Sequence, residues 1–277
     1  MTSPDFERRF GGLRRLYGPA GAQAIFSAHV IVVGIGGVGS WAAEALARSG
    51  VGQLTLIDLD HVSESNINRQ IHALGTTLGQ SKVQAMRQRI ADINPHCQVH
   101  LVDDFITPDN LASLLPPAMP PPGSGPLALL DACDQVRAKT ALAAWAQANA
   151  CLHITVGAAG GKQRAQAVEV ADLADVTHDP LLAQLRYRLR KHHGAPRTAR
   201  IGVACVFSRE NVAPPDAACQ LPGTSAPADS SLNCHGYGSV VTVTATFGLV
   251  AAGHLLGALA KTSTISAAAS KPQKMTL

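Results

Sequence analysis

The stretch HVIVVGIGGVGSWAAEALARSG, residues 29–50, decides which fold the chain adopts. An apolar run ends in a glycine-rich turn, and an amphipathic segment of small residues follows at once. This order predicts a β-strand, a tight turn and a helix that starts at the turn. The unpaired N–H groups and the dipole at such a helix start favour an anionic phosphate. The glycines that we expect to bind it are Gly34, Gly36, Gly37 and Gly39.

Strand patterns and helix patterns alternate along the first part of the chain. We predict strands at residues 29–33, 54–58, 98–102, 127–131 and 152–156. Helices are predicted between them at residues 38–48, 79–93, 109–115 and 135–149. Alternation of this kind is typical of βαβ units, which place their strands in one parallel sheet. We therefore expect an α/β fold, with a Rossmann-like, doubly wound and mainly parallel sheet flanked by helices.

Length and composition are typical of a globular protein rather than a disordered one. The chain has 277 residues, of which 46% are hydrophobic and 15% are charged, and its formal net charge is +4. Because this charge is mild, a polyanionic partner must be held by a local basic patch. The cysteines show no paired spacing and the N-terminal MTSPDFERRF is polar, so we expect reduced thiols in a cytoplasmic protein.

Residues 239–260, SVVTVTATFGLVAAGHLLGALA, have about the length of a membrane span and carry no formal charge. Threonines, glycines and His254 lower the hydropathy of the segment, which favours a buried core or interface helix. Membrane contact is the alternative. We expect residues 116–126 and 212–233, which are rich in proline, to form loops, and residues 262–277 to form a disordered tail.

Polar and charged side chains follow the second predicted strand. Asp58 ends that strand, where a carboxylate can accept hydrogen bonds from the ribose hydroxyls of either NAD or ATP. Asp60 is a second acidic candidate in the same place. The remaining candidates for this part of the site are Asn66, Arg69, Gln70 and, early in the next helix, Lys82.

The added cations favour a nucleoside triphosphate over a dinucleotide. Backbone N–H groups largely bind the single pyrophosphate of NAD, whereas a leaving pyrophosphate gains charge that Arg69 and Lys82 can stabilise. Asp134, which follows the fourth predicted strand, is placed to bind the Mg²⁺ that bridges the phosphates. The alternatives are that these residues are ordinary surface charges, or that the protein is an NAD oxidoreductase.

Six motifs resemble the adenylating domain of ubiquitin-activating-type enzymes, a family that includes the molybdopterin- and thiamine-pathway adenylyltransferases. They are GIGGVGS, the Asp58-x-Asp60 ending, N-x-x-R-Q at residues 66–70, G-x-x-K at 79–82, INPH at 93–96 and DACD at 131–134. The resemblance implies an ATP-binding adenylating domain at residues 1–160. Residues 161–261 are expected to continue it as a smaller C-terminal extension.

Further motifs point to one branch of that family. The chain lacks the C-x-x-C pairs that hold a structural zinc in the sulfur-carrier-activating branch. RRFGGLRRLYG, NRQIHALG, LVDDFITPDN, VGAAGGK, DPLLAQLRYRLRK and CVFSRE instead resemble the bacterial tRNA threonylcarbamoyladenosine dehydratases, over almost the whole chain. That resemblance implies a homodimer that uses ATP and Mg²⁺ to adenylate the carboxylate of N6-threonylcarbamoyladenosine in tRNA. The activated carbonyl is then attacked intramolecularly, with loss of AMP and, in net terms, of water.

The same resemblance implies further partners and ions. A sulfur-acceptor protein and a cysteine desulfurase are expected as a partner system. A monovalent cation, Na⁺ or K⁺, is expected near the backbone of NCHGYG, residues 233–238. Cys234 in that motif is a candidate reactive thiol or pocket-lining residue, with a structural cysteine as the alternative.

The N-terminal motif departs from the sulfur-carrier branch, which typically reads R-Y-x-R and sends the second arginine into the partner subunit's ATP site. Here Arg9 is kept, and Gly12 stands at the second position. We expect Arg9 to act in catalysis, with Arg14 and Arg15 as alternatives for a charge that crosses the dimer. An arginine-rich, solvated helix end is the competing interpretation.

Residues 184–200, QLRYRLRKHHGAPRTAR, form a basic stretch without an acidic residue. Concentrated positive charge around Tyr187 suits contact with a phosphate backbone and stacking on a base. The residues expected to contact tRNA are Arg186, Arg188, Arg190 and Lys191. A solvated helix face is the alternative.

Two other functions stay open from the sequence. One is a zinc-free adenylyltransferase that activates the C-terminus of a small sulfur-carrier protein. The other is a non-catalytic ATP-binding scaffold for tRNA or sulfur relay. Intact Arg69, Lys82 and Asp134 argue against a scaffold, which has no need of groups that serve leaving phosphates.

Overall fold

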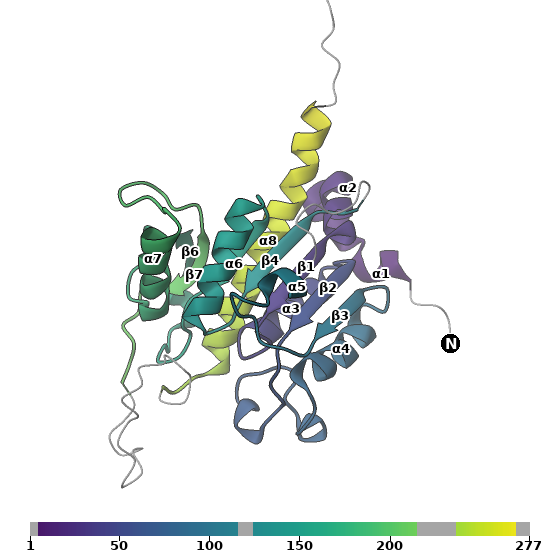
Figure 1. The fold of residues 1–277 in the computed structure, drawn as a ribbon. Coiled ribbons are helices and arrows are strands. Elements are labelled where there is room, and N and C mark those ends of the chain that lie inside the picture. The colour runs from purple at the N-terminus through teal and green to yellow at the C-terminus, as the bar shows by residue number, and fades with distance from the viewer. Residues whose placement is uncertain (1–4, 116–123, 215–236, 270–277) are drawn as a thin grey trace, which may run out of the picture.

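A seven-stranded sheet forms the centre of the molecule (Figure 1). The computed structural model describes residues 5–115, 124–214 and 237–269. The strands are β1 (His29–Val33), β2 (Gln53–Ile57), β3 (Gln98–Val102), β4 (Leu127–Asp131), β5 (Leu152–Val156), β6 (Val168–Asp172) and β7 (Ala204–Ser208). They lie in the order β3-β2-β1-β4-β5-β7-β6, and every neighbouring pair is parallel except β6 with β7. The expected Rossmann-like fold is confirmed.

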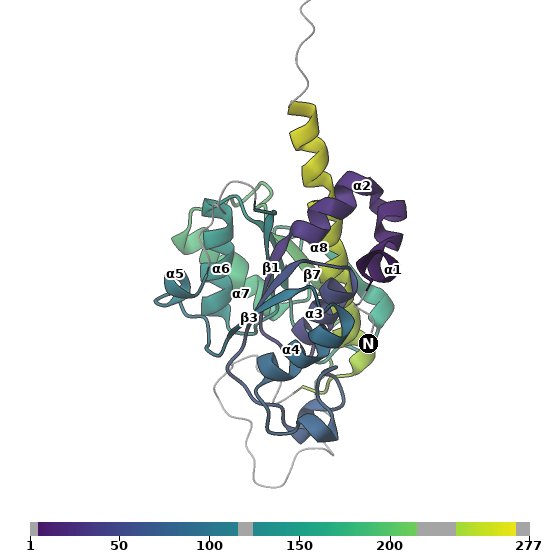
Figure 2. The same ribbon diagram turned by 90° about the vertical axis from the view of Figure 1, so that its right-hand side faces the viewer.

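The helices cover both faces of the sheet (Figure 2). They are α1 (Phe6–Phe10), α2 (Gly12–Ser27), α3 (Gly39–Arg48), α4 (Lys82–Ile93), α5 (Leu111–Leu114), α6 (Val136–Ala148), α7 (Pro180–His192) and α8 (Val241–Ala269). Short 3-10 turns occupy Glu64–Asn66, Gly75–Thr77 and Ala165–Ala167. The α3, α4 and α8 helices lie on one face, and α5 and α6 lie on the other (Figure 2).

Alternation along the strands explains these two layers. Val30 and Val32 of β1 enter the core under α3 and α8, whereas Ile31 and Val33 enter the core under α5 and α6. Successive side chains of a strand point to opposite faces, so an uninterrupted apolar run is what a doubly covered strand requires. A third cluster joins α7 to β7 and α6.

The order of the strands creates a switch point between β1 and β4. From β1 the chain runs outward to β2 and β3, and it then returns to β4 on the other side of β1. The loops that leave the carboxyl ends of β1 and β4 diverge there, and ligands of open α/β sheets bind in such a crevice. The glycine turn and Asp134 therefore belong to the same edge.

The last helix, α8, completes the core of the first half of the chain. Residues Val241–Thr262 are long and apolar enough to cross a membrane, with a mean hydropathy of 1.6. One face of α8 is nevertheless buried against α2, α3 and β5, through Val243, Phe247, Leu255 and Leu259. The packing agrees with a core helix, and it shows that residues 1–160 do not enclose their own core.

The C-terminal part continues the first domain, because β7 and β6 extend the same sheet beyond β5. One expectation for this part needs correction. The α8 helix continues to Ala269, although a disordered tail was expected from residue 262. No glycine or proline interrupts residues 262–269, so the sequence holds no helix breaker there. Residues 270–277, 116–123 and most of the 212–233 loop, together with Cys234, lie outside the described residues.

Candidate nucleotide-binding site

The glycine turn after β1 is tied to the end of β2 by Asp58. Its Oδ2 accepts a hydrogen bond from the N–H of Ile35 at 2.6 Å, and its Oδ1 accepts one from Asp60 at 2.9 Å. Burial raises the pKa of Asp58, against the opposing effects of Lys82 and the two N–H groups. Each carboxylate oxygen keeps a further lone pair for a ribose hydroxyl.

Two glycines hold the turn against its neighbours. Gly34 has a φ of +84°, and a Cβ built on it would lie 2.9 Å from the backbone of Ala132 and Cys133. A Cβ on Gly39 would lie 1.7 Å from the carbonyl oxygen of Gly34. The turn thus packs directly against the segment that follows β4, and only glycine permits this approach.

The outer part of the turn is open to a ligand. A Cβ on Gly36 would meet no atom within 4 Å. In the part of the chain that the structure describes, the N–H groups of Gly36, Gly37 and Val38 have no acceptor. Three unpaired N–H groups at the start of α3 are suited to bind phosphate oxygens, as predicted for the glycine motif.

Arg69 lies against this turn. A Cβ on Gly37 would be 3.2 Å from Cγ of Arg69, and Trp41 Nε1 donates to the Arg69 carbonyl at 2.9 Å. The guanidinium Nη1 donates to the carbonyl of Ser65 at 2.7 Å and to Oδ1 of Asn68 at 2.9 Å. The α8 helix also reaches the turn, because Thr244 lies beside Gly37.

Lys82 begins α4, and its side chain is buried. Its Nζ lies 2.7 Å from Oδ2 of Asp60, which is more than half exposed. The positive charge of Lys82 also acts on Asp58, where it opposes the rise in the pKa of that carboxyl group. Asp60 and Lys82 therefore both lie near the end of β2. An incoming phosphate can compete with Asp60 for this ammonium group.

Asn66 and Gln70 differ in their surroundings, although both are buried. Asn66 Oδ1 accepts from the Ser63 N–H at 3.1 Å, so it stabilises the 3-10 turn in which it lies. Gln70 Oε1 is buried without a hydrogen-bond partner among the described residues. Burying this oxygen without a hydrogen bond costs free energy of desolvation, and a hydrogen bond from a bound nucleotide or water would offset it.

Asp134 is exposed just beyond β4. Its Oδ1 accepts from Gln135 Nε2 at 3.5 Å. Within the described residues, no group of three or more histidine, cysteine or acidic side chains could hold a metal ion alone. A single solvent-facing carboxylate beside a phosphate site fits Mg²⁺, which keeps several waters and takes its other ligands from phosphates.

Arg9 lies away from the glycine turn of its own chain. Its Nη1 donates to the carbonyls of Asp92 and Ile93 at 2.9 and 2.7 Å, at the C-terminal end of α4. Lys82 begins the same helix, and at 1.5 Å per residue the two ends are roughly 16 Å apart. Any catalytic role of Arg9 in this geometry requires another subunit or a rearrangement.

The two neighbouring arginines differ in their partners. Arg14 forms an ion pair with Glu7 at 2.7 Å, and its guanidinium lies over the ring of Phe26. Arg15 is exposed and has no hydrogen-bond or ion-pair partner in the described ranges. Of the arginines proposed to act across a dimer, Arg15 is therefore the one whose side chain is unengaged.

The basic residues of α7 fall into two groups. Arg186 Nη1 donates to the carbonyls of Leu173 and Val176, and Arg190 donates to those of Pro196 and Arg197. These two guanidinium groups fasten the helix to adjacent loops. In contrast, Lys191 lies over the Tyr187 ring at 5.6 Å, and Arg188 has no partner in the described part of the chain.

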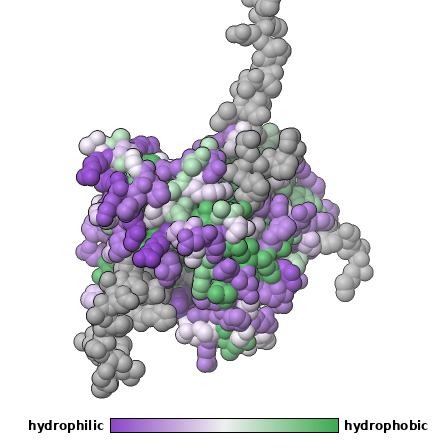
Figure 3. All heavy atoms as spheres, viewed as in Figure 1, coloured by the Kyte–Doolittle hydropathy of each residue, from purple (hydrophilic) through white to green (hydrophobic). Residues whose placement is uncertain are grey.

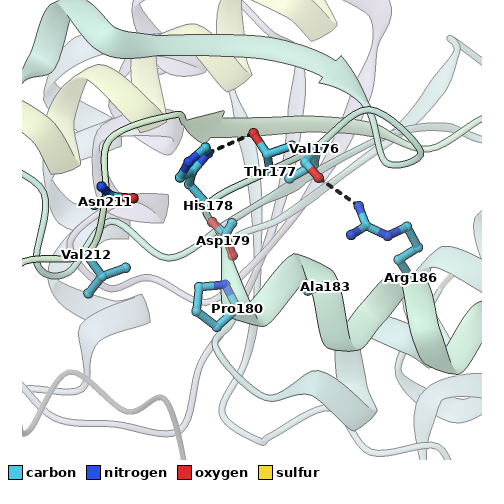
Figure 4. A pocket seen from close by; sticks show the side chains of 9 residues that line it. All are labelled: Val176, Thr177, His178, Asp179, Pro180, Ala183, Arg186, Asn211 and Val212. Atoms are coloured by element: carbon cyan, nitrogen blue, oxygen red, sulfur yellow. Dashed lines mark hydrogen bonds between the residues drawn. The ribbon is translucent and has the colours of Figure 1, made fainter.

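Two hollows adjoin α7 and share Ala183 and Arg186. One has a volume of about 520 Å³ and is lined by Ala183, Arg186, Tyr187, Arg190, Lys191 and Arg197. The other, of about 510 Å³, lies between the start of α7 and the segment after β7 (Figure 4). Hydrophilic side chains gather over the α7 side of the molecule (Figure 3). Both hollows are distinct from the glycine turn.

Lys162, in the VGAAGGK motif, fixes the loops at one edge of the hollow between the start of α7 and the segment after β7. Its buried Nζ donates to the carbonyls of His178 at 3.0 Å and Ser208 at 3.3 Å, and to that of Glu210. Burial lowers the pKa of Lys162, an effect that Asp179 and Glu210 oppose. The ammonium group thereby joins the loops that precede α7 and follow β7.

Two buried groups escaped the sequence analysis. Asp131 and Lys139 form a fully buried ion pair, with Nζ 3.0 Å from Oδ2. The signal was available, since Lys139 shares a helical face with buried Leu142 and Ala146. His72 is also buried near Lys82, and neither ring nitrogen has a hydrogen-bond partner among the described residues. Burial, and then Lys82 and Arg89, lower the pKa of His72 to about 4, so its ring is neutral at pH 7.

Comparison with known proteins agrees with this geometry. The model of the ThiF family matches residues 9–275. The tRNA threonylcarbamoyladenosine dehydratase of Escherichia coli K12 is 45% identical over 262 residues, which are 92% of this chain and 95% of that protein. Its namesake from Haemophilus influenzae is 40% identical over 260 residues, or 93% and 95% of the two chains. The structure of E. coli tRNA N6-threonylcarbamoyladenosine dehydratase in complex with ATP has a TM-score of 0.79 and 41% identity, and covers 98% of this chain and 100% of that one. The resemblance carried by the sequence motifs is confirmed, and this chain belongs to the ThiF family.

Proposed function

We propose that this protein is an ATP-dependent tRNA threonylcarbamoyladenosine dehydratase. The observation that carries the proposal is the open glycine turn with unpaired N–H groups, next to Arg69, Lys82, Asp58 and, at the neighbouring strand end, Asp134. Relatives that match nearly the whole chain bear this enzyme's name, and one of them was solved with ATP. The substrate is accordingly N6-threonylcarbamoyladenosine in tRNA, and the product is its cyclic form.

The first chemical step is an adenylation. A carboxylate oxygen of the threonyl group attacks the α-phosphorus, and the bond to the bridging oxygen breaks as pyrophosphate leaves. The N–H groups of Gly36 to Val38 hold phosphate oxygens, and Asp58 holds the ribose. Arg69 and Lys82 stabilise the charge that develops on the leaving group, after exchanging their present partners Ser65 and Asp60 for phosphate.

The second step closes the ring. A nucleophilic atom of the carbamoyl group attacks the activated carbonyl, and AMP leaves with the electron pair of the broken bond. The substrate thus loses one water in net terms, and ATP becomes AMP and pyrophosphate. Asp134 would hold Mg²⁺, which offsets phosphate charge when bound.

The tRNA is proposed to approach along α7. Arg188 and Lys191 form no ion pair with the described residues, and Tyr187, over which Lys191 lies, offers an exposed ring for a base. Arg186 and Arg190 were expected to contact tRNA directly; their bonds to backbone carbonyls support a role in holding the hollow open. A basic, aromatic-lined hollow suits an unpaired nucleotide better than a helix.

The remaining expectations from the family stay proposals. The protein acts as a cytoplasmic homodimer, in which Arg15, Arg14 or Arg9 supplies a charge to the partner subunit. A sulfur-acceptor protein and a cysteine desulfurase serve as partners. A monovalent cation binds near residues 233–238, and Cys234 is a reactive thiol.

The decisive experiment is mass spectrometry of tRNA nucleosides. The protein is incubated with ATP, Mg²⁺ and tRNA that carries N6-threonylcarbamoyladenosine, and the digest is searched for loss of one water from that nucleoside. We expect the product only when ATP is present, with a Lys82→Ala variant as the inactive control. Absence of the product from reactions with folded protein, ATP and Mg²⁺ overturns the proposal.

A second assay separates the competing functions. Pyrophosphate exchange into ATP that requires this tRNA, and ignores a sulfur-carrier protein ending in Gly-Gly, supports the dehydratase. Exchange that requires the carrier protein instead supports a zinc-free carrier-activating enzyme. ATP binding without exchange under either condition supports a scaffold.

A further inference from the structure

A fully buried ion pair lies directly beneath the candidate Mg²⁺ ligand. Asp131 ends β4 and Lys139 lies on the inner face of α6, and neither side chain is exposed to solvent. Thr155 of β5 donates its hydroxyl to Asp131 Oδ2 at 2.7 Å, the same oxygen that Lys139 approaches at 3.0 Å. Three elements, β4, β5 and α6, therefore fix this one carboxylate.

The other oxygen of Asp131 holds the turn that follows β4. Oδ1 accepts hydrogen bonds from the N–H of Cys133 at 3.1 Å and from its thiol at 3.0 Å. A carboxylate that binds the N–H two residues later sets the direction of the chain at that point. The next residue is Asp134, so the bond determines where its carboxylate starts.

The same turn is the surface against which the glycine turn packs. A Cβ on Gly34 would lie 2.9 Å from the backbone of Ala132 and Cys133, so the two turns touch through their main chains. Any shift of the segment that Asp131 holds must change the distance between Asp134 and the phosphate-binding N–H groups.

Both members of the pair are charged at neutral pH. Burial alone would raise the pKa of Asp131, but Lys139 and the bonds from Cys133 and Thr155 outweigh it and hold the pKa below its ordinary value. Burial alone would lower the pKa of Lys139, but Asp131 outweighs it and raises that pKa. A buried pair of this kind adds little stability over apolar residues of similar shape. The effect of the pair is therefore to fix the position of the Asp131 carboxylate.

We propose that Asp131 and Lys139 are positioning residues, which hold Asp134 beside the glycine turn, where its carboxylate would hold Mg²⁺ next to the ATP phosphates. The inference rests on the proposed function, and neither residue touches the substrate. Groups behind a metal ligand typically change metal affinity by about 10- to 100-fold when altered.

Two double variants test the proposal against a merely structural role. Asp131→Leu with Lys139→Met removes both charges together and also removes the acceptor for Cys133. Asp131→Asn with Lys139→Met removes the same charges but keeps an oxygen that can accept from Cys133. Because no buried charge is left unpaired in either variant, both are expected to fold.

The measurements are the Mg²⁺ concentration for half-maximal tRNA-dependent pyrophosphate exchange, and calorimetric ATP binding with and without Mg²⁺. We expect the Leu/Met variant to need about 10-fold more Mg²⁺ or worse, and to lose the Mg²⁺-dependent part of ATP binding. ATP binding without Mg²⁺ should stay unchanged. The Asn/Met variant should need an intermediate Mg²⁺ concentration, because it keeps the acceptor for Cys133 but lacks the ammonium group that holds Asp131.

Controls keep the outcome unambiguous. Leu259→Ala, in the buried part of α8 far along the helix from Thr244, lowers stability and should leave the Mg²⁺ requirement unchanged. Should the Leu/Met variant not fold, Thr155→Val deletes one donor to Asp131 while keeping its shape, and should raise the Mg²⁺ requirement about threefold. A folded Leu/Met variant, or a folded Thr155→Val variant in its place, with wild-type Mg²⁺ dependence overturns the positioning role, whereas a wild-type protein without ATP-dependent activity overturns the proposed function instead.

Discussion

Gly36 and Gly39 stand in one turn, yet an added methyl group meets opposite surroundings at the two positions. At Gly36 it would contact no atom within 4 Å, whereas at Gly39 it would overlap the Gly34 carbonyl oxygen at 1.7 Å. We expect Gly36→Ala to melt as the wild type does but to weaken ATP binding at least about 10-fold, since the methyl group enters the phosphate space. Gly39→Ala should lower the free energy of unfolding by roughly 2 kcal/mol or more.

Thermal melts and calorimetric titration with ATP check both expectations at this residue scale. The Gly36→Ala variant is the informative one, because it separates binding from folding. If it binds ATP with wild-type affinity, the unpaired N–H groups of Gly36 to Val38 are not the phosphate site.

Some contacts of single residues cannot be predicted from the sequence, because they form only in the folded molecule. Arg69 and Lys82 could be proposed for the site because they follow Asp58, which comes directly after β2. The burial of Lys139 could be read from its helical face, but its partner Asp131 could not be predicted, since the two meet only when α6 is folded onto β4. His72 is similar: its burial depends on the whole excursion between β2 and α4, which has no regular pattern of apolar residues.

At the scale of elements, α7 combines packing with recognition. Leu182, Leu185 and Leu189 face the core, and the outer surface carries Arg188 and Lys191, which form no ion pair with the described residues. We expect the double variant Arg188→Ala, Lys191→Ala to bind tRNA more weakly. The slope of log K against log salt should become shallower by about 1 to 2, because binding with fewer phosphate contacts releases fewer counterions.

Filter binding at several salt concentrations measures this slope, and Arg186→Ala is the matched comparison. Because Arg186 holds the carbonyls of Leu173 and Val176, its loss should lower the melting temperature more than the double variant does. Unchanged tRNA affinity of the double variant would show that α7 presents a solvated face, the alternative that the sequence left open.

The helices and strands that the sequence predicted are those whose pattern of apolar and polar residues is uninterrupted. The five predicted strands, β1 to β5, are found, with β2 one residue earlier than expected, whereas the parallel strand β7 was not predicted. The α2 helix was missed because Gly18 and Pro19 break its pattern, and the chain bends there at a φ of 73°. The β6 strand was missed because its five residues, VEVAD, include two acidic residues and most of them are only partly buried at the sheet edge.

At the scale of the whole molecule, the proposed homodimer predicts that each ATP site takes an arginine from the partner subunit. Arg15 is exposed and unengaged, so we expect it to act on the partner's ATP in a homodimer. Arg15→Ala and Lys82→Ala should each be inactive alone. Mixed and re-equilibrated, they should regain about one quarter of the wild-type activity, because half of the dimers then hold one intact site.

Exchange assays on the mixture, with tRNA and ATP, provide the measurement. Recovery requires that Arg15 and Lys82 of one site come from different chains. A mixture that stays inactive, despite demonstrated subunit exchange, places Arg15 either within its own site or outside catalysis.

The packing of α8 against α2 and α3 has a consequence for biosynthesis. The helix that covers one apolar face of the first strands is translated after all of them. During synthesis that face of the sheet stays exposed until α8 has emerged from the ribosome. An exposed apolar face of this kind is prone to aggregation and is a surface that chaperones bind.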